Sequence, residues 1–212
     1  MELKDLPPDL LAQTITYLSF KEVENLCSTD KTIKSFCLGT RPSHKRIWRE
    51  LILNTFRNIP NINSIIENTF NCKGDSCWNY ITYTNLVKAL PEYVQGLIYL
   101  RMNDMESLKD LDSELINIIA IVENRKDLIV SDGSESESIA RSLTVPMLRR
   151  RMFGKSLSVV IKYPEALKSI LSRQDISKND ILAALDKATR DVELGEDRTE
   201  SIKLLEERLS QL

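Results

Sequence analysis

Few side chains in this sequence have the types and the spacing that enzyme chemistry requires. His44 is the single histidine; it stands in a polar helix start, and no partner for acid–base catalysis is evident beside it. Carboxylates are plentiful, but pairs such as Glu135 and Glu137 stand in charged surroundings, where ordinary pKa values are expected. The sequence also lacks a phosphate-binding glycine loop, a zinc-protease helix, a nucleophile elbow and a dinucleotide fingerprint. We therefore expect a protein that binds partners, is not an enzyme and needs no cofactor.

The four cysteines offer two alternatives, a metal site or plain thiols. Cys72 and Cys77 flank four residues and could form half of a zinc site. Structural zinc, however, usually takes closer paired ligands and a second pair from cysteine or histidine. With Cys27 and Cys37, the set is too small and too scattered for a disulfide scaffold in a chain that can build its own core. We expect reduced thiols and no metal.

The composition is that of a helical globular protein. Of the 212 residues, 42 % are hydrophobic and 28 % are charged, which is enough apolar material for one sizeable domain or two small ones. Glycine and proline number only 6 and 7, and apolar residues rarely alternate with a period of two. The sequence therefore predicts an all-α fold of helices joined by short turns.

Charge and hydropathy restrict the partners and the location. The net charge is −2, so there is no global attraction to nucleic acid or to an anionic membrane, and any such binding has to be local. No apolar run approaches the roughly 20 residues of a membrane span, and the N-terminus lacks the layout of a secretory signal. We expect a protein partner, no membrane, and an intracellular location, either cytoplasmic or nuclear.

The first fifty-odd residues have the signals of four short amphipathic helices. Pro7 and Pro8 suit a first helical turn, whose amides need no partner, and Asp9 places a carboxylate at the positive helix end. Ser19, with Glu22 three residues later, fits a capping box that begins a second helix. Further helix starts are expected at Thr29 or Asp30 and at Pro42–Ser43.

The order of apolar residues across these helices resembles the F-box family. That family combines a Leu-Pro pair, three aliphatic-rich helices and a downstream tryptophan followed by an aliphatic residue. The matching residues here are Leu6, Pro7, Leu10, Leu11, Ile15, Leu18, Val23, Leu26, Ile33, Phe36, Trp48 and Leu51. The stretch 25–37 is most similar to the F-box-like N-termini that large DNA viruses encode in many copies, and this resemblance implies association with a virion as an alternative location. It departs from cellular F-boxes at Thr32–Cys37, where those have a segment of the type Cys/Val-Cys-Arg-x-Trp.

The resemblance covers roughly residues 3–56 and implies a function as well as a fold. F-box proteins recruit a Skp-type adaptor of a cullin ubiquitin ligase and hold a target with the rest of the chain. By this resemblance, residues 1–57 are an F-box-like helical module and residues 58–212 are a C-terminal helical domain that binds a target. The implied adaptor-binding residues are Leu6, Pro7, Leu10, Leu11, Ile15, Leu18 and Trp48.

An alternative keeps the same helices and treats their apolar residues as core only. They would then pack against a helix within 108–128 in one α-domain, and the protein would be a structural or nuclear-acting viral factor. Its working surface would be a basic patch that contacts nucleic acid or another partner, made of Arg149, Arg150, Arg151 and Lys155. Three consecutive arginines spread around a helix, so a solvated helix end is the plainer interpretation. The exposure of the N-terminal leucines would distinguish the two alternatives.

The C-terminal domain is expected to be a helical bundle or a degenerate helical repeat. The interval 108–128 is the most hydrophobic and predicts a buried central helix. Residues 131–138 form an acidic, serine-rich loop that can cap a helix near Ile139. The helical segments within 160–212 are similar to the end of an ankyrin-type array, although the glycine-bearing hairpins of that family are absent.

Overall fold

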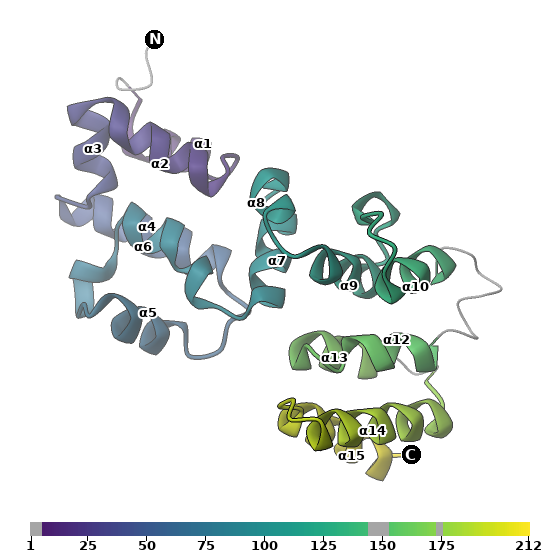
Figure 1. The fold of residues 1–212 in the computed structure, drawn as a ribbon. Coiled ribbons are helices and arrows are strands. Elements are labelled where there is room, and N and C mark those ends of the chain that lie inside the picture. The colour runs from purple at the N-terminus through teal and green to yellow at the C-terminus, as the bar shows by residue number, and fades with distance from the viewer. Residues whose placement is uncertain (1–5, 144–152, 173–175) are drawn as a thin grey trace. The chain divides into compact units, whose positions relative to one another are not determined.

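The computed structural model describes residues 6–143, 153–172 and 176–212, and these residues form helices and turns without a strand (Figure 1). The predicted all-α class is confirmed. Within the described ranges, no helix combines the length and the apolar character that crossing a membrane would require.

The chain divides into two compact units, residues 1–108 and residues 109–212. This boundary lies about fifty residues after Arg57, which is the predicted end of the F-box-like module. The helices of the first unit are α1 Pro8–Ile15, α2 Phe20–Thr29, α3 Lys31–Cys37, α4 Pro42–Thr55, α5 Ile62–Phe70, α6 Tyr80–Asn85 and α7 Glu92–Arg101. Short 3₁₀ turns at Gly74–Cys77 and Val87–Ala89 flank α6, and α8 Met105–Lys109 lies at the boundary.

The predicted helix starts of the first unit are confirmed, because each is encoded by local side chains. Ser19 caps α2 by accepting from the amide of Glu22, and the Glu22 carboxylate accepts in return from the amide of Ser19 at 2.8 Å. The Asp30 carboxylate caps α3 by accepting from the amide of Thr32 at 2.7 Å. Pro8 and Pro42 open α1 and α4, where the missing proline N–H costs nothing.

An aromatic cluster explains why the first unit does not end near Arg57. The Tyr83 ring of α6 lies 5.3 Å from Phe20 and 5.6 Å from Trp48, and Tyr99 of α7 lies 6.1 Å from Phe20. Phe56 also packs against Phe20 and Tyr83. Residues on both sides of Arg57 therefore share one core, and burial of this size stabilises them together.

The expectation of reduced thiols is wrong for this structure, in which all four cysteines are paired. A disulfide joins Cys27 of α2 to Cys37 of α3, with the two Cα atoms 5.7 Å apart, and a second joins Cys72 to Cys77. Cα separations of this size suit a disulfide. The sequence positions alone gave no sign that α2 and α3 pack side by side.

The second unit contains six helices within the described residues. They are α9 Ser113–Glu123, α10 Glu135–Leu143, α12 Phe153–Val160, α13 Pro164–Leu171, α14 Lys178–Glu193 and α15 Thr199–Ser210. A 3₁₀ turn at Lys126–Leu128 follows α9. The predicted buried helix within 108–128 is confirmed as α9, in which every residue from Leu115 to Ile121 is buried.

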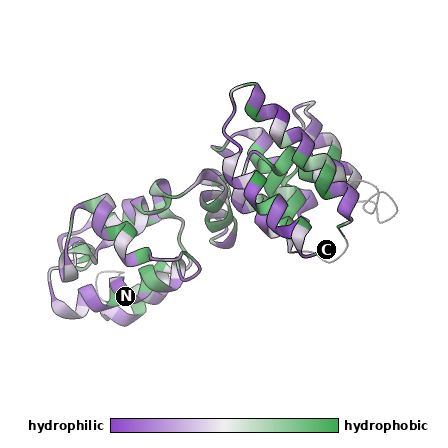
Figure 2. Cartoon of the chain, turned by 90° about the horizontal axis from the view of Figure 1, so that it is seen from below, coloured by the Kyte–Doolittle hydropathy of each residue, from purple (hydrophilic) through white to green (hydrophobic). Residues whose placement is uncertain are grey.

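These six helices form three stacked pairs, α9 with α10, α12 with α13, and α14 with α15 (Figure 1). One row of the stack runs through α10, α12 and α14, and the other through α9, α13 and α15. In the second unit, apolar residues concentrate on the helix faces that turn inward (Figure 2). The buried Ser201 hydroxyl of α15 donates to the carbonyl oxygen of Ile161 at 2.8 Å and so ties the last pair to the middle one.

Candidate docking surface

The first helix divides the predicted adaptor-binding residues between the core and the solvent. Leu11 and Ile15 point inward, with 4 % and 0 % of their surface exposed. Leu10 is 46 % exposed and Pro7 is also exposed. This difference between adjacent leucines follows from the helix, since successive residues are rotated by about 100°. The amphipathic stripe seen in the sequence is thus a core face with one leucine outside it.

Leu6 and Leu18 lie between these extremes, because both are half-buried. Tyr17, in the turn after α1, is 87 % exposed. Tyr17 was not predicted as a docking residue, because it follows the end of α1 and is not part of the F-box-like pattern. The exposed apolar side chains along and beside α1 are therefore Pro7, Pro8, Leu10 and Tyr17, and Leu6 and Leu18 are half-buried.

Trp48 does not belong to this surface. Its indole is fully buried and donates its Nε1–H to the carbonyl oxygen of Phe36 at 2.9 Å. The rings of Phe36 and Tyr83 each lie 5.6 Å away. A side chain held in this way contributes to the core and can reach a partner only if the unit opens.

A hollow of about 460 Å³ lies beside the start of α1. Its walls come from the start of α1, from α3 and from the start of α4. The apolar lining residues are Leu6, Pro8, Leu11, Ile33 and Phe36, and the polar ones are Lys31, Thr32, Ser35, Arg41 and His44. An apolar floor with cations at its edge is suited to binding and offers no acid–base pair for catalysis.

His44 is a packed wall residue of this hollow. It is 6 % exposed, its Nδ1 lies 3.3 Å from the carbonyl oxygen of Ser35, and its ring lies 5.3 Å from Phe36. No carboxylate among the described residues is bonded to it. Groups of three or more potential metal ligands are likewise not found in the described ranges.

The basic patch is mostly outside the described residues. Arg149, Arg150 and Arg151 lie between residues 143 and 153, outside the residues that the structure describes. Lys155 lies on α12 and is exposed.

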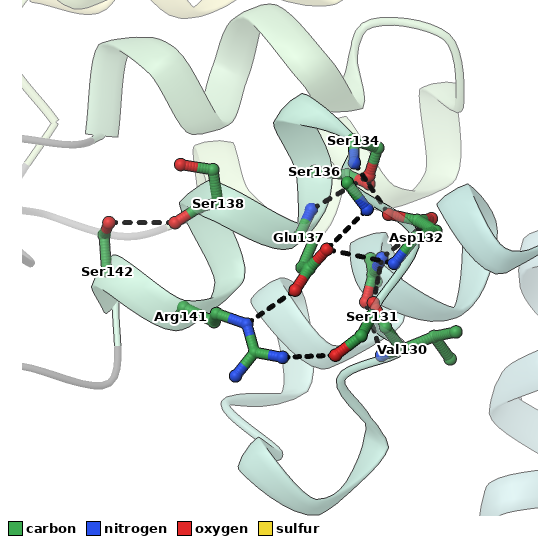
Figure 3. A network of polar contacts seen from close by, with 11 residues as sticks. Val130, Ser131, Asp132, Ser134, Ser136, Glu137, Ser138, Arg141 and Ser142 are labelled. Carbon is green, nitrogen blue, oxygen red and sulfur yellow. Dashed lines mark hydrogen bonds and ion pairs between the residues drawn. The ribbon is translucent and has the colours of Figure 1, made fainter.

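The acidic, serine-rich loop before α10 is held by a polar network (Figure 3). The Glu137 carboxylate accepts from the amides of Asp132 and Gly133 at 2.9 and 2.6 Å, and from the Arg141 guanidinium at 2.7 Å. These hydrogen bonds, that of Arg141 first, hold the pKa of Glu137 below its ordinary value. The helix begins at Glu135, ahead of the expected start near Ile139, because the network brings the loop into the helix cap.

Asn117 of α9 holds the residue that precedes the same loop, Val130, by two hydrogen bonds. This residue of α9 is fully buried; its amide group donates to the carbonyl oxygen of Val130 at 3.1 Å and accepts from the Val130 amide at 2.8 Å. Ser136 is also buried, and its hydroxyl shares a hydrogen bond with that of Ser134. The cluster is therefore a structural cap, with its polar groups satisfied by one another.

Comparisons with protein-family models, with curated proteins and with solved structures found no significant match for this chain. The F-box-like and ankyrin-like resemblances accordingly rest on the residue pattern. What the structure itself provides is the bounds of the four N-terminal helices, the exposure of the residues in that pattern, and the pairing of the helices in the second unit.

Proposed function

We propose that this chain is a non-enzymatic interaction protein whose helices α1–α4 form an F-box-like docking module. In this proposal the module recruits a Skp-type adaptor of a cullin ubiquitin ligase, and the second unit binds a target. The observation that carries the proposal is the exposure of Leu10 and Pro7 on a helix whose other face, with Leu11 and Ile15, is already buried. The core therefore does not account for all the apolar residues of α1.

The docking surface of this proposal is smaller than the set implied by the resemblance. It consists of Leu6, Pro7, Leu10 and Leu18, with Tyr17 added. Leu11, Ile15 and Trp48 support it from inside, since they fix the orientation of α1. Burial of exposed aliphatic and aromatic side chains at about 25 cal/mol per Å² would supply the affinity, and a charge placed among them would oppose it.

The stacked helix pairs of the second unit support the proposed role in target binding. Helical-pair arrays use extended surfaces along their rows of helices to hold partners. In the pairs α12–α13 and α14–α15, the first helix lies in one row and the second helix in the other, as in such an array. In the pair α9–α10, the first helix lies in the row of α13 and α15, and the second helix lies in the row of α12 and α14. We propose a degenerate ankyrin-like array with α12–α15 as its regular part.

The test is co-precipitation of a Skp-type adaptor with the full chain and with Leu10→Asp. The account expects the wild type to recover adaptor and the variant to lose most of it, at unchanged helicity and melting temperature. Leu11→Asp is not a usable test, because a carboxylate at a buried position would unfold the unit.

A matched control is Leu182→Asp, which makes the same change at a position of α14 that is 42 % exposed. It should recover adaptor as the wild type does. Failure of the folded wild type to recover adaptor would reject ligase-type recruitment. Equal recovery by Leu10→Asp would reject the surface assigned to it.

A further inference from the structure

A cationic segment in the first unit is left unexplained by the proposed docking function. Residues 31–49 contain six lysines and arginines and no aspartate or glutamate. They are Lys31, Lys34, Arg41, Lys45, Arg46 and Arg49. Since the net charge of the chain is −2, the residues outside this segment carry eight more acidic than basic side chains. Residues 31–49, which form α3, the following turn and most of α4, thus carry six positive charges in a chain that is acidic as a whole.

These six cations stand apart from the ion pairs of the molecule. Elsewhere, cations such as Lys21, Arg141 and Lys162 contact carboxylates at 2.6–2.7 Å. None of the six forms an ion pair within the described part of the chain. Five of them are exposed, and Lys45 is half-buried. None of these charges is therefore neutralised by a direct ion pair in the described residues.

The helix geometry arranges three of these cations in a row. Arg41, Lys45 and Arg49 recur at every fourth position, so they follow one side of α4 at about 6 Å per step along the axis. At the far end, the Arg49 guanidinium lies 5.7 Å from the centre of the Trp78 ring. Arg41 and Lys31 line the same hollow at the near end, which extends the row onto α3.

The turn between α3 and α4 is fixed by Gly39. Its φ is +63°, and a Cβ atom there would lie 2.6 Å from the carbonyl oxygen of Trp78. Two helices joined by a short turn with glycine are a frame that nucleic-acid-binding proteins use repeatedly. Here α4 is the second helix of the frame, and it carries four of the six cations if its N-cap Arg41 is included.

The positive end of α4 has no anionic cap among the residues that the structure describes. Its first turn contains no acidic residue, and no side chain caps it. Cations at this end oppose the helix dipole, so Arg41 and Lys45 cost stability where they stand. An anion bound over the start of α4 would reverse that cost and would also meet its first-turn amides.

The exposed side chains between the cations favour phosphate over a protein surface. They include the hydroxyl residues Thr32, Thr40 and Ser43, whereas Leu38 is the one large apolar side chain of 31–49 above 40 % exposure. Protein interfaces need buried apolar anchors at their centre. Lysine, arginine, serine and threonine are the residues that contact phosphate oxygens in nucleic-acid complexes.

From these observations we propose that the α3–turn–α4 face binds the phosphate backbone of a nucleic acid. The binding is electrostatic, and the sequence of the nucleic acid is not read by the six cations. If four of them contact phosphates of a duplex, the logarithm of the affinity falls with the logarithm of the salt concentration with a slope of about −3.6. Raising the salt from about 50 to about 200 mM then weakens binding on the order of 100-fold.

The test measures fluorescence anisotropy of three labelled probes, a short duplex DNA, a duplex RNA and a single-stranded DNA, with the full chain at several salt concentrations. Arg41→Ala/Arg46→Ala should weaken binding and lower the salt slope by about two for the duplexes. Arg41→Lys/Arg46→Lys should retain the slope. The relative affinities of the three probes distinguish the sources of the phosphate backbone.

The matched control is Lys168→Ala/Lys178→Ala, which removes two exposed cations of the second unit and changes the net charge equally. It should leave the slope unchanged. The proposal is overturned if no probe binds at low salt, or if Arg149→Ala/Arg150→Ala/Arg151→Ala alone abolishes binding. It is also overturned if unlabelled poly-L-glutamate displaces the probe better than unlabelled DNA at equal charge, which would indicate an acidic protein partner.

Discussion

Trp48 and Leu11 show that residues of an apolar sequence pattern can belong to the core, whereas a neighbouring leucine of the same pattern lies at the surface. Both belong to the F-box-like pattern, and both are enclosed by their own unit, with 0 % and 4 % exposure. Leu10, adjacent to Leu11, faces solvent. The spacing of apolar residues predicted the helix and its buried stripe. It could not assign each leucine to a side, because the stripe was wide and the packing partners lie far along the chain.

The role of Trp48 leads to a stability prediction. Trp48→Phe removes the indole hydrogen bond, leaves the buried Phe36 carbonyl oxygen without that donor, and opens a small cavity. The free energy of unfolding should fall by about 2 kcal/mol or more. Chemical denaturation followed by circular dichroism measures this loss. Adaptor recovery by the folded variant should be unchanged, and its selective loss at full stability would instead place Trp48 at the interface.

The disulfide between Cys27 and Cys37 gives a second prediction at this scale. Thiol titration of the denatured, unreduced protein should find no free thiol. Cys27→Ala/Cys37→Ala should lower the free energy of unfolding by about 3 kcal/mol, because it releases a loop constraint in the unfolded chain. Cys72→Ala/Cys77→Ala, with a separation of 5 residues in place of 10, should cost less. Four reactive thiols would contradict the pairing.

Helix starts were the most predictable elements, because their signals are local. The Ser19–Glu22 box, Asp30 and Pro42 each specify a helix start within a few residues of sequence. The start of α10 was predicted too late, since the loop before it is also held by Asn117 of α9, which lies 13 residues before Val130 in sequence. The outer face of α1 also needed the structure, because the residues that cover its inner face lie far along the chain.

The α10 cap should make stability depend on pH. The pKa of Glu137 is lowered by Arg141 and the loop amides, so its ionised form stabilises the folded state. That contribution is complete above the ordinary carboxyl pKa of 4.5 and is lost as the pH falls through the lowered value. Glu137→Gln should therefore melt below the wild type at neutral pH, with the difference shrinking as the pH is lowered past 4.5. A difference independent of pH would contradict this role.

For the whole molecule, the division into residues 1–108 and 109–212 reflects two separate hydrophobic cores, one in each unit. Contacts between aromatic rings follow no sequence period, so the sequence did not predict that Tyr83 and Tyr99 pack against Phe20 in one core. The paired helices of the second unit were partly predictable, since α13, α14 and α15 each carry a clear apolar face.

This division predicts the behaviour of fragments. Fragments 1–108 and 109–212 should each unfold cooperatively when expressed alone. Fragment 1–57 should not, because Phe20, Trp48 and Phe56 would lose the covering rings of Tyr83 and Tyr99. Thermal denaturation followed by circular dichroism measures this. A sharp transition in fragment 1–57 would show that the first four helices are self-sufficient.

Hydrogen exchange on the unmodified full chain tests whether the outer side of α1 docks a Skp-type adaptor. Amide exchange is compared with and without saturating adaptor. With adaptor bound, we expect slower amide exchange in the segment from Leu6 to Leu18 and unchanged exchange in α14 of the second unit. Exchange in Leu6–Leu18 that is unaffected by adaptor, whether or not the second unit becomes protected, would contradict it.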